Sequence, residues 1–182
     1  MDVITHPDTN QLYLVLGGQS AAVRLTSLAA HLALRGPLLL LDCGNRANPL
    51  PLARELRRLT ADPVPALRRI STARAFTCYQ VAALFEQVSG CPAPQPVLVF
   101  DLLASFYDES VTYAEARRLL EQCLRGLAEM RRCAPVLVSA RPPLADFPER
   151  AVFVELLRAI ADRCWIEELP QPPRERQLSL LR

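Results

Sequence analysis

Lysine is absent from this chain of 182 residues, so all 21 of its basic side chains are arginine. Arginine binds carboxylates and phosphates through two parallel hydrogen bonds, whereas lysine offers a compact point charge. The bias toward arginine accompanies many alanine, proline and leucine residues, a combination typical of a GC-rich genome, so it does not by itself indicate an anionic ligand. The net charge of +2 is also too small to predict a nucleic-acid or membrane binder.

Paired metal ligands and long apolar runs are missing as well. No two of the six cysteines form a C-x-x-C pair, and the two histidines, His6 and His31, lie near no cysteine cluster, which argues against a zinc site. Isolated cysteines indicate a reducing compartment, and we expect the cytoplasm. Apolar runs such as Pro37 to Leu41 are far shorter than the ~20 residues that a membrane span needs. The polar, acidic start from Met1 to Asn10 predicts no signal peptide.

The overall composition is that of a globular protein. Hydrophobic residues make up 51% of the chain and charged residues 22%, which is enough apolar material for a core. The length corresponds to about one domain, so we expect residues 1–182 to form a single unit.

Short apolar runs alternate with amphipathic segments along the chain. The runs predict strands at Leu12–Leu16, Leu38–Asp42, near Leu67–Ser71, and at Val97–Asp101 and Val136–Val138. The amphipathic segments predict helices at Ala21–Arg35, Pro49–Leu59, Thr77–Val88, Thr112–Arg132 and Pro148–Ala161. This order predicts an α/β fold with a central, mostly parallel sheet flanked by helices. The segments Cys164–Ile166 and Gln177–Leu181 are expected to pair as a C-terminal antiparallel hairpin.

Ligands of such sheets bind at the carboxyl ends of the strands, which directs attention to the loop after the first strand. That loop and the start of its helix comprise Gly17, Gly18, Gln19, Ser20, Ala21, Ala22, Val23 and Arg24. A phosphate-binding loop reads G-x-x-x-x-G-K-[ST]. Counting from Gly17 or from Gly18, neither register supplies the second glycine, the lysine or the hydroxyl. Alone, the loop fits both a degenerate nucleotide site and an ordinary glycine turn.

The run Val97 to Phe100 ends in an acid, Asp101. An apolar strand that ends in aspartate is typical of a Walker B strand, whose carboxylate orients water around a magnesium ion. Asp101 is therefore the candidate metal residue, acting on magnesium through water.

The order and spacing of three stretches resemble the core of the RecA/RadA family of recombinases and their paralogues. These stretches are Leu12–Gly18 with its helix, Ile70–Gln80 with the sequence Ala73-Arg74-Ala75, and Val97–Asp101 with the long helix and strand Pro135–Ser139 that follow. The resemblance covers almost the whole chain. It implies a RecA-like P-loop NTPase fold. The expected C-terminal hairpin also fits the terminal hairpin of that family.

The chain departs from the family at the residues that carry its chemistry. Gly44 stands where the resemblance implies a catalytic glutamate after the second strand, and Arg141 stands where it implies a glutamine. The first DNA-binding loop of the family is matched by a short acidic segment, Tyr107–Ser110, and the second by the short segment Pro142–Phe147. Losing the lysine, the hydroxyl and the carboxylate removes several separate sources of transition-state stabilisation. We therefore expect a degenerate ATPase with no catalytic residues.

The resemblance implies an accessory role in DNA recombination or repair, in which the chain docks on a RecA-like protein or forms a homo-oligomer. The Gly17–Arg24 segment and Arg141 would form the tentative nucleotide-binding face and meet the neighbour. We expect no cofactor, or weak binding of ATP and magnesium, and at most weak or indirect contact with DNA. Two alternatives stay open. One is a weakly hydrolysing ATPase in which Arg24 replaces the lysine and Asp101 alone holds the metal. The other is a stand-alone regulator without a role in DNA metabolism.

Overall fold

The computed structural model describes residues 7–90, 95–143 and 148–167, which form six strands and six α-helices. The strands are β1 (Leu12–Leu16), β2 (Leu38–Asp42), β3 (Ile70–Arg74), β4 (Val97–Phe100), β5 (Val136–Ala140) and β6 (Arg163–Ile166). The helices are α1 (Gln19–Arg35), α2 (Pro49–Leu59), α3 (Val64–Arg68), α4 (Cys78–Ser89), α5 (Tyr113–Met130) and α6 (Val152–Ile160), with 3₁₀ turns at Ala104–Tyr107 and Pro148–Ala151. No helix in the described residues combines the length and hydropathy that crossing a membrane would require.

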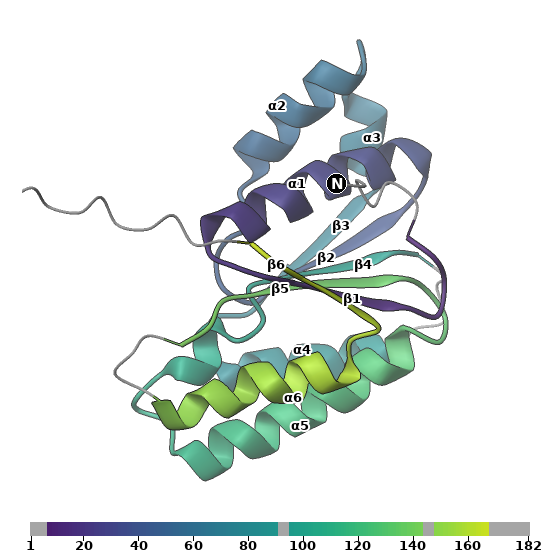
Figure 1. The fold of residues 1–182 in the computed structure, drawn as a ribbon. Coiled ribbons are helices and arrows are strands. Elements are labelled where there is room, and N and C mark those ends of the chain that lie inside the picture. The colour runs from purple at the N-terminus through teal and green to yellow at the C-terminus, as the bar shows by residue number, and fades with distance from the viewer. Residues whose placement is uncertain (1–6, 91–94, 144–147, 168–182) are drawn as a thin grey trace, which may run out of the picture.

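The strands form one parallel sheet in the order β3-β2-β4-β5-β1-β6 (Figure 1). The inner strands β2, β4, β5 and β1 are the continuous apolar runs, because a strand covered on both faces has no side that needs polar residues. This confirms the predicted α/β architecture with interior strands at these four segments.

Two helical layers enclose the sheet. Helices α1, α2 and α3 lie on one face, and α4, α5 and α6 lie on the other (Figure 1). Side chains alternate between these layers along each strand. In β1, for example, Leu14 packs toward α4–α6, and its neighbours Tyr13 and Val15 pack toward α1. Because helices cover both faces of the sheet, loops can build a site at the ends of the strands, and in parallel sheets that site lies at the carboxyl ends.

Side-chain caps explain where three helices begin. Asn48 accepts a hydrogen bond from the Leu50 amide at 2.9 Å at the start of α2, and Thr77 accepts one from Gln80 at 3.2 Å at the start of α4. Thr112 accepts one from the Glu115 amide at 3.3 Å, which caps α5.

Two sequence predictions need correction. The expected strand near Leu67–Ser71 begins instead at Ile70, because Val64–Arg68 forms helix α3, whose Pro65 occupies a first-turn position that suits proline. Strand β6 pairs parallel to β1, whereas the sequence predicts the first arm of an antiparallel hairpin around Cys164–Ile166. The parallel pairing follows from α6, which carries the chain back across the sheet before β6 begins. The expected second arm, Gln177–Leu181, lies outside the described residues.

Candidate functional site

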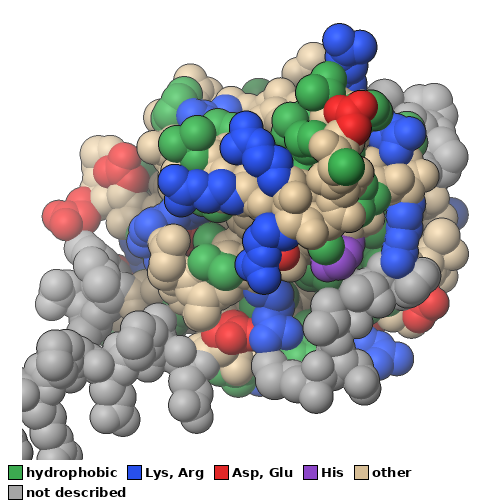
Figure 2. All heavy atoms as spheres, turned by 90° about the horizontal axis from the view of Figure 1, so that it is seen from above, with side chains coloured by type: hydrophobic (Ala, Val, Ile, Leu, Met, Phe, Trp, Pro, Cys, Tyr) green, Lys and Arg blue, Asp and Glu red, His purple; other side chains and the backbone are tan. Residues whose placement is uncertain are grey.

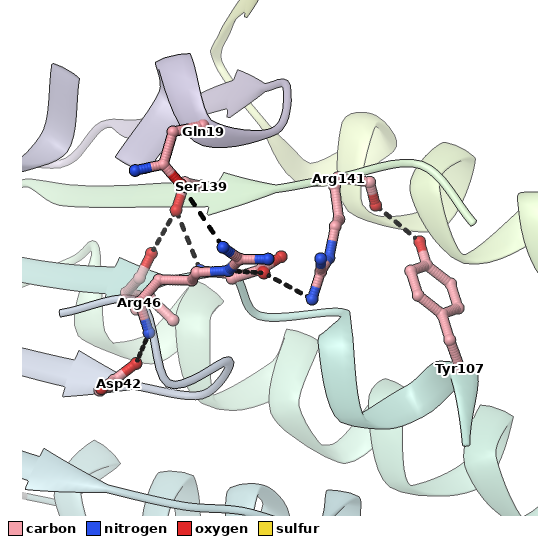
Figure 3. Close-up of polar contacts among 8 residues, drawn as sticks. Gln19, Asp42, Arg46, Tyr107, Ser139 and Arg141 are labelled. Atoms are coloured by element: carbon pink, nitrogen blue, oxygen red, sulfur yellow. Dashed lines mark hydrogen bonds and ion pairs between the residues drawn. The ribbon is translucent and has the colours of Figure 1, made fainter. Parts of the chain in front are cut away.

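Five charged residues gather at the carboxyl ends of the central strands. We call Asp42, Arg46, Arg74, Asp101 and Arg141 the strand-end cluster. They come from the end of β2, the loop after it, the end of β3, and the residues that directly follow β4 and β5. Because these strands are parallel and adjacent in the sheet, their carboxyl ends bring together residues that are far apart in the sequence (Figure 3).

Asp42 is the buried anchor of the cluster. It is 0% exposed, and its Oδ2 lies 2.8 Å from Nε of Arg74 on the neighbouring strand. Its Oδ1 accepts a hydrogen bond from the Arg46 amide at 2.8 Å. Arg74 also donates from Nη2 to the Ala47 carbonyl at 3.3 Å. Asp42 therefore ties the β2–α2 loop to strand β3, and its charge is used within the protein.

Asp101 is the second buried carboxylate, and its backbone adopts the left-handed conformation with φ 50°. The Asp101 amide donates to the buried Ser139 hydroxyl on β5 at 2.9 Å, which holds this turn in place. Its Oδ2 lies 3.1 Å from Nη2 of Arg141 and 3.6 Å from Nε of Arg46. Burial raises the pKa of Asp101, and the nearby Arg141 and Arg46 offset only part of that effect.

Gly44 fits against Asp101 because it lacks a side chain. A Cβ atom at this position would lie 2.5 Å from Asp101 Cβ and 2.9 Å from Asp101 Cγ. Such distances require a shift of the surrounding atoms, and Asp101 is fixed through its amide and its two arginines. The place where the family resemblance implies a glutamate therefore has no room for any side chain while Asp101 stays where it is.

The loop after β1 contains only Gly17 and Gly18, because α1 begins at Gln19. Ser20, Ala21, Ala22, Val23 and Arg24, all predicted as nucleotide-binding residues, therefore lie in the first two turns of the helix. Within this helix, the side chains of Ala21 and Ala22 are buried, and the side chain of Val23 is exposed. A Cβ atom on Gly17 would lie 2.8 Å from Cβ of Glu167, the residue that follows β6. The loop is thus a tight turn packed against the end of a neighbouring strand.

Glu167 also holds Arg24, the residue proposed to replace the missing lysine. Arg24 Nη2 and Glu167 Oε1 are 2.5 Å apart, and the Glu167 amide donates to the Leu16 carbonyl at 2.7 Å. Arg24 is therefore paired with a carboxylate of the chain itself. Its positive charge is used in this pair and is not available to a phosphate.

The structure separates the predicted site residues into two groups. Gln19, Asp101 and Arg141 belong to one group (Figure 3). Arg46 bridges Gln19 and Asp101, because its Nη1 donates to Gln19 Oε1 at 3.4 Å while its Nε faces Asp101, and Arg141 pairs directly with Asp101. Arg24 instead turns toward Glu167 at the end of β6. Whether these residues bind a nucleotide stays a prediction.

Magnesium does not suit the surroundings of Asp101. Two guanidinium groups lie within 3.6 Å of its carboxylate, and they would repel a divalent cation. Within residues 7–90, 95–143 and 148–167, no three His, Cys, Asp or Glu side chains come together as a metal site.

A buried arginine fixes the short acidic loop between β4 and α5. Arg150 donates to the carbonyls of Phe106, Asp108 and Val111, at 2.5, 2.9 and 2.7 Å respectively. Hydrogen bonds from Ser110 lower the pKa of Asp108, so this loop keeps its negative charge. Tyr107 in the same loop donates its hydroxyl to the Arg141 carbonyl at 2.9 Å and so positions Arg141 (Figure 3).

Sequence reasoning missed several members of this site. The sequence predicts Asp42 only as the last residue of the strand Leu38–Asp42 and Ser139 only as the end of the stretch Pro135–Ser139, and it gives Arg46 and Glu167 no role. Arg74 was noted only as part of a family-like stretch. Asp42, Arg74 and Glu167 lie at the end of a strand or directly after one, and that position was the available signal, because parallel strands bring such residues to one end of the sheet.

No protein-family model matches the chain, and a search of curated protein sequences finds no significant match. Its function is therefore inferred from the geometry of the strand-end cluster and from the sequence pattern.

Proposed function

We propose that this protein is a non-hydrolysing interaction module that docks onto a RecA-like partner and assists DNA recombination or repair in the cytoplasm. One observation carries the non-hydrolysing part. Arg24 and Asp101, the two residues left to perform nucleotide chemistry, are both engaged in ion pairs within the chain. To bind ATP and a metal, the protein would first have to break these pairs, and breaking partly buried ion pairs is costly.

The open edge of the sheet supports the docking part of the proposal. Strand β3 is one of the two edge strands in the described residues and pairs only with β2, while β6 forms the opposite edge. The Ala75 amide donates to the Asp42 carbonyl, so the alternation of the strand turns the Thr72 and Arg74 backbone groups outward. Unpaired backbone groups on an edge strand are a template for a strand from another protein.

A pocket on each side of β3 would receive alternate side chains of such a strand. One, of about 140 Å³, lies between β3, α1 and α2 and includes Leu40, Leu52 and Thr72. The other, of about 300 Å³, lies on the opposite face and includes Leu39, Ala73 and Val88. Backbone pairing supplies affinity in this mode of recognition, and the two pockets supply specificity.

A proline on β3 tests the docking edge. Thr72→Pro removes an outward amide without removing a hydrogen bond to β2, whereas Thr72→Val keeps the amide and is the matched control. Each variant is expressed with an affinity tag in the source cell, and co-purified RecA-like protein is quantified. We expect Thr72→Pro to lower recovery about tenfold and Thr72→Val to leave it unchanged. Equal recovery with both variants would exclude β3 as the docking edge.

Light scattering and ATP turnover test the remaining parts of the proposal. A strict monomer that retrieves no RecA-like protein would leave only the stand-alone regulator. Turnover with magnesium at about 1 per second or faster, abolished by Asp101→Ala, would instead establish the ATPase alternative.

A further inference from the structure

The outer surface of helices α2 and α3 combines basic and aliphatic side chains. We call it the α2–α3 face, and it consists of Leu50, Arg54, Arg57, Val64, Leu67 and Arg68. Leu52 and Leu56 turn inward from α2 and are buried, so helical spacing places Arg54 and Arg57 on the opposite side. Figure 2, which views the molecule from the side of these helices, shows arginine side chains gathered among hydrophobic ones.

The arginines of this face have no ionic partner in the described residues. Arg58 beside them is 3.5 Å from Glu55, and Arg69 donates to the carbonyls of Ala33 and Leu34 at the end of α1. By contrast, Arg54, Arg57 and Arg68 form no ion pair within residues 7–90, 95–143 and 148–167. Their charge is available for a ligand.

The aliphatic side chains of the face are widely exposed. Leu50 is 65% exposed and Val64 is 49% exposed. A phosphate backbone would cover the arginines but would leave these side chains in water, and the α2–α3 face has no aromatic ring on which bases could stack. Exposed apolar side chains interspersed with arginine are a composition that protein interfaces favour.

Charge excludes two occupants that come from the chain itself. The segment 168–182 contains three arginines and two glutamates, so it does not complement a basic surface. A second copy bound symmetrically through this face would set arginine against arginine. The occupant must therefore be acidic.

We propose that the α2–α3 face binds an acidic amphipathic helix, in which a stripe of leucine-like residues lies between glutamates or aspartates. The apolar stripe would cover Leu50, Val64 and Leu67, and the carboxylates would pair with Arg54, Arg57 and Arg68. This proposal rests on different groups from the docking of a RecA-like partner, because it uses exposed side chains of α2 and α3, whereas that docking uses backbone groups of β3.

The test uses a fluorescent synthetic peptide of about 20 residues with this pattern and a second peptide in which every glutamate is glutamine. Fluorescence anisotropy with the full chain measures both affinities. We expect the glutamine peptide to bind about tenfold more weakly. The variant R54Q/R57Q/R68Q should lose a similar factor, whereas the control R117Q/R118Q/R125Q, which removes three exposed arginines from α5 on the other layer, should bind as the unchanged protein does.

A third variant separates the apolar contribution from the charge. L50S/V64S should weaken binding of the acidic peptide while leaving its salt dependence unchanged, because the arginines remain. The proposal is overturned if the acidic and glutamine peptides bind equally, or if the α5 control loses as much affinity as the face variant. It is also overturned if single-stranded DNA competes the peptide away at lower concentration than unlabelled peptide does, which would mark the face as a nucleic-acid site.

Discussion

The arginines of the strand-end cluster and those of the α2–α3 face illustrate two uses of the same side chain. At the strand ends, Arg74 and Arg141 lie against buried carboxylates at 2.8 and 3.1 Å. On the α2–α3 face, Arg54 and Arg57 are exposed and unpaired in the described residues. A desolvated charge pair such as that of Asp42 with Arg74 contributes to the fold, because removing one member leaves the other unpaired, whereas charges left in water contribute little to stability and remain available for binding. Substitutions in the strand-end cluster should therefore change stability, whereas substitutions on the α2–α3 face should change binding.

The largest effect is expected from Asp42. Asp42→Ala removes the acceptor of the Arg46 amide and leaves Arg74 without its carboxylate, so we expect the free energy of unfolding to fall by about 3 kcal/mol. Urea unfolding measures the loss, with Asp42→Asn as the control, because asparagine can still accept from the amide and should cost less. A loss below about 1 kcal/mol would mean that the buried pair is not needed for stability.

Close packing at Gly44 gives the next largest effect. Gly44→Ala forces a Cβ atom to within 2.5 Å of Asp101 Cβ, and such overpacking costs about 2 kcal/mol. Gly36→Ala is the matched control, because a Cβ atom there meets nothing within 4 Å. Thermal unfolding of both variants distinguishes a steric cause from the general effect of replacing glycine. Equal stability of the two would contradict the close approach of Gly44 and Asp101.

Asp101 offers a smaller effect that depends on pH. Its pKa is raised chiefly by burial, so the folded protein binds a proton at this carboxyl more readily than the unfolded chain does. The resulting stability is present at low pH and is lost as pH rises from the ordinary value of 3.8 through the raised pKa of the folded state. Asp101→Asn stays neutral, so its free energy of unfolding should lack this decline and differ at pH 7 by less than about 1 kcal/mol.

Urea unfolding of both proteins across the acidic range measures the decline. A wild-type stability that instead rises with pH relative to Asp101→Asn would show that Arg141 and Arg46 outweigh burial. The carboxylate would then contribute to stability as Asp42 does.

The sheet was more predictable from the sequence than the site. Leu12–Leu16 and Val97–Phe100 are interior strands, and a strand covered on both faces must be apolar, so its run is visible in the sequence. The sequence predicts strand β3 three residues too early, because β3 is an edge strand whose exposed Ser71 and Thr72 leave no apolar run.

The strand-end pairs could not be predicted because they depend on register. Asp42 meets Arg74 because these residues lie opposite each other in the β2–β3 pairing, although 32 positions of sequence separate them (74 − 42). Glu167 reaches Arg24 only because β6 lies beside β1. A single sequence shows which residues follow strands but does not show which strands are neighbours. The pairing that occupies Arg24 and Asp101 therefore became visible only in the structure.

The smallest expected effect on stability comes from the α2–α3 face. R54Q/R57Q/R68Q changes three exposed side chains that have no ionic partner in the described residues, so the free energy of unfolding should change by less than about 0.5 kcal/mol. The same variant should lose most of its affinity for the acidic peptide, and this separation of stability from binding distinguishes the face from the strand-end cluster. Urea unfolding and anisotropy on one preparation measure both quantities. Should the variant lose as much stability as Asp42→Ala, these arginines would have to contribute to the fold, and the distinction between the two regions would fail.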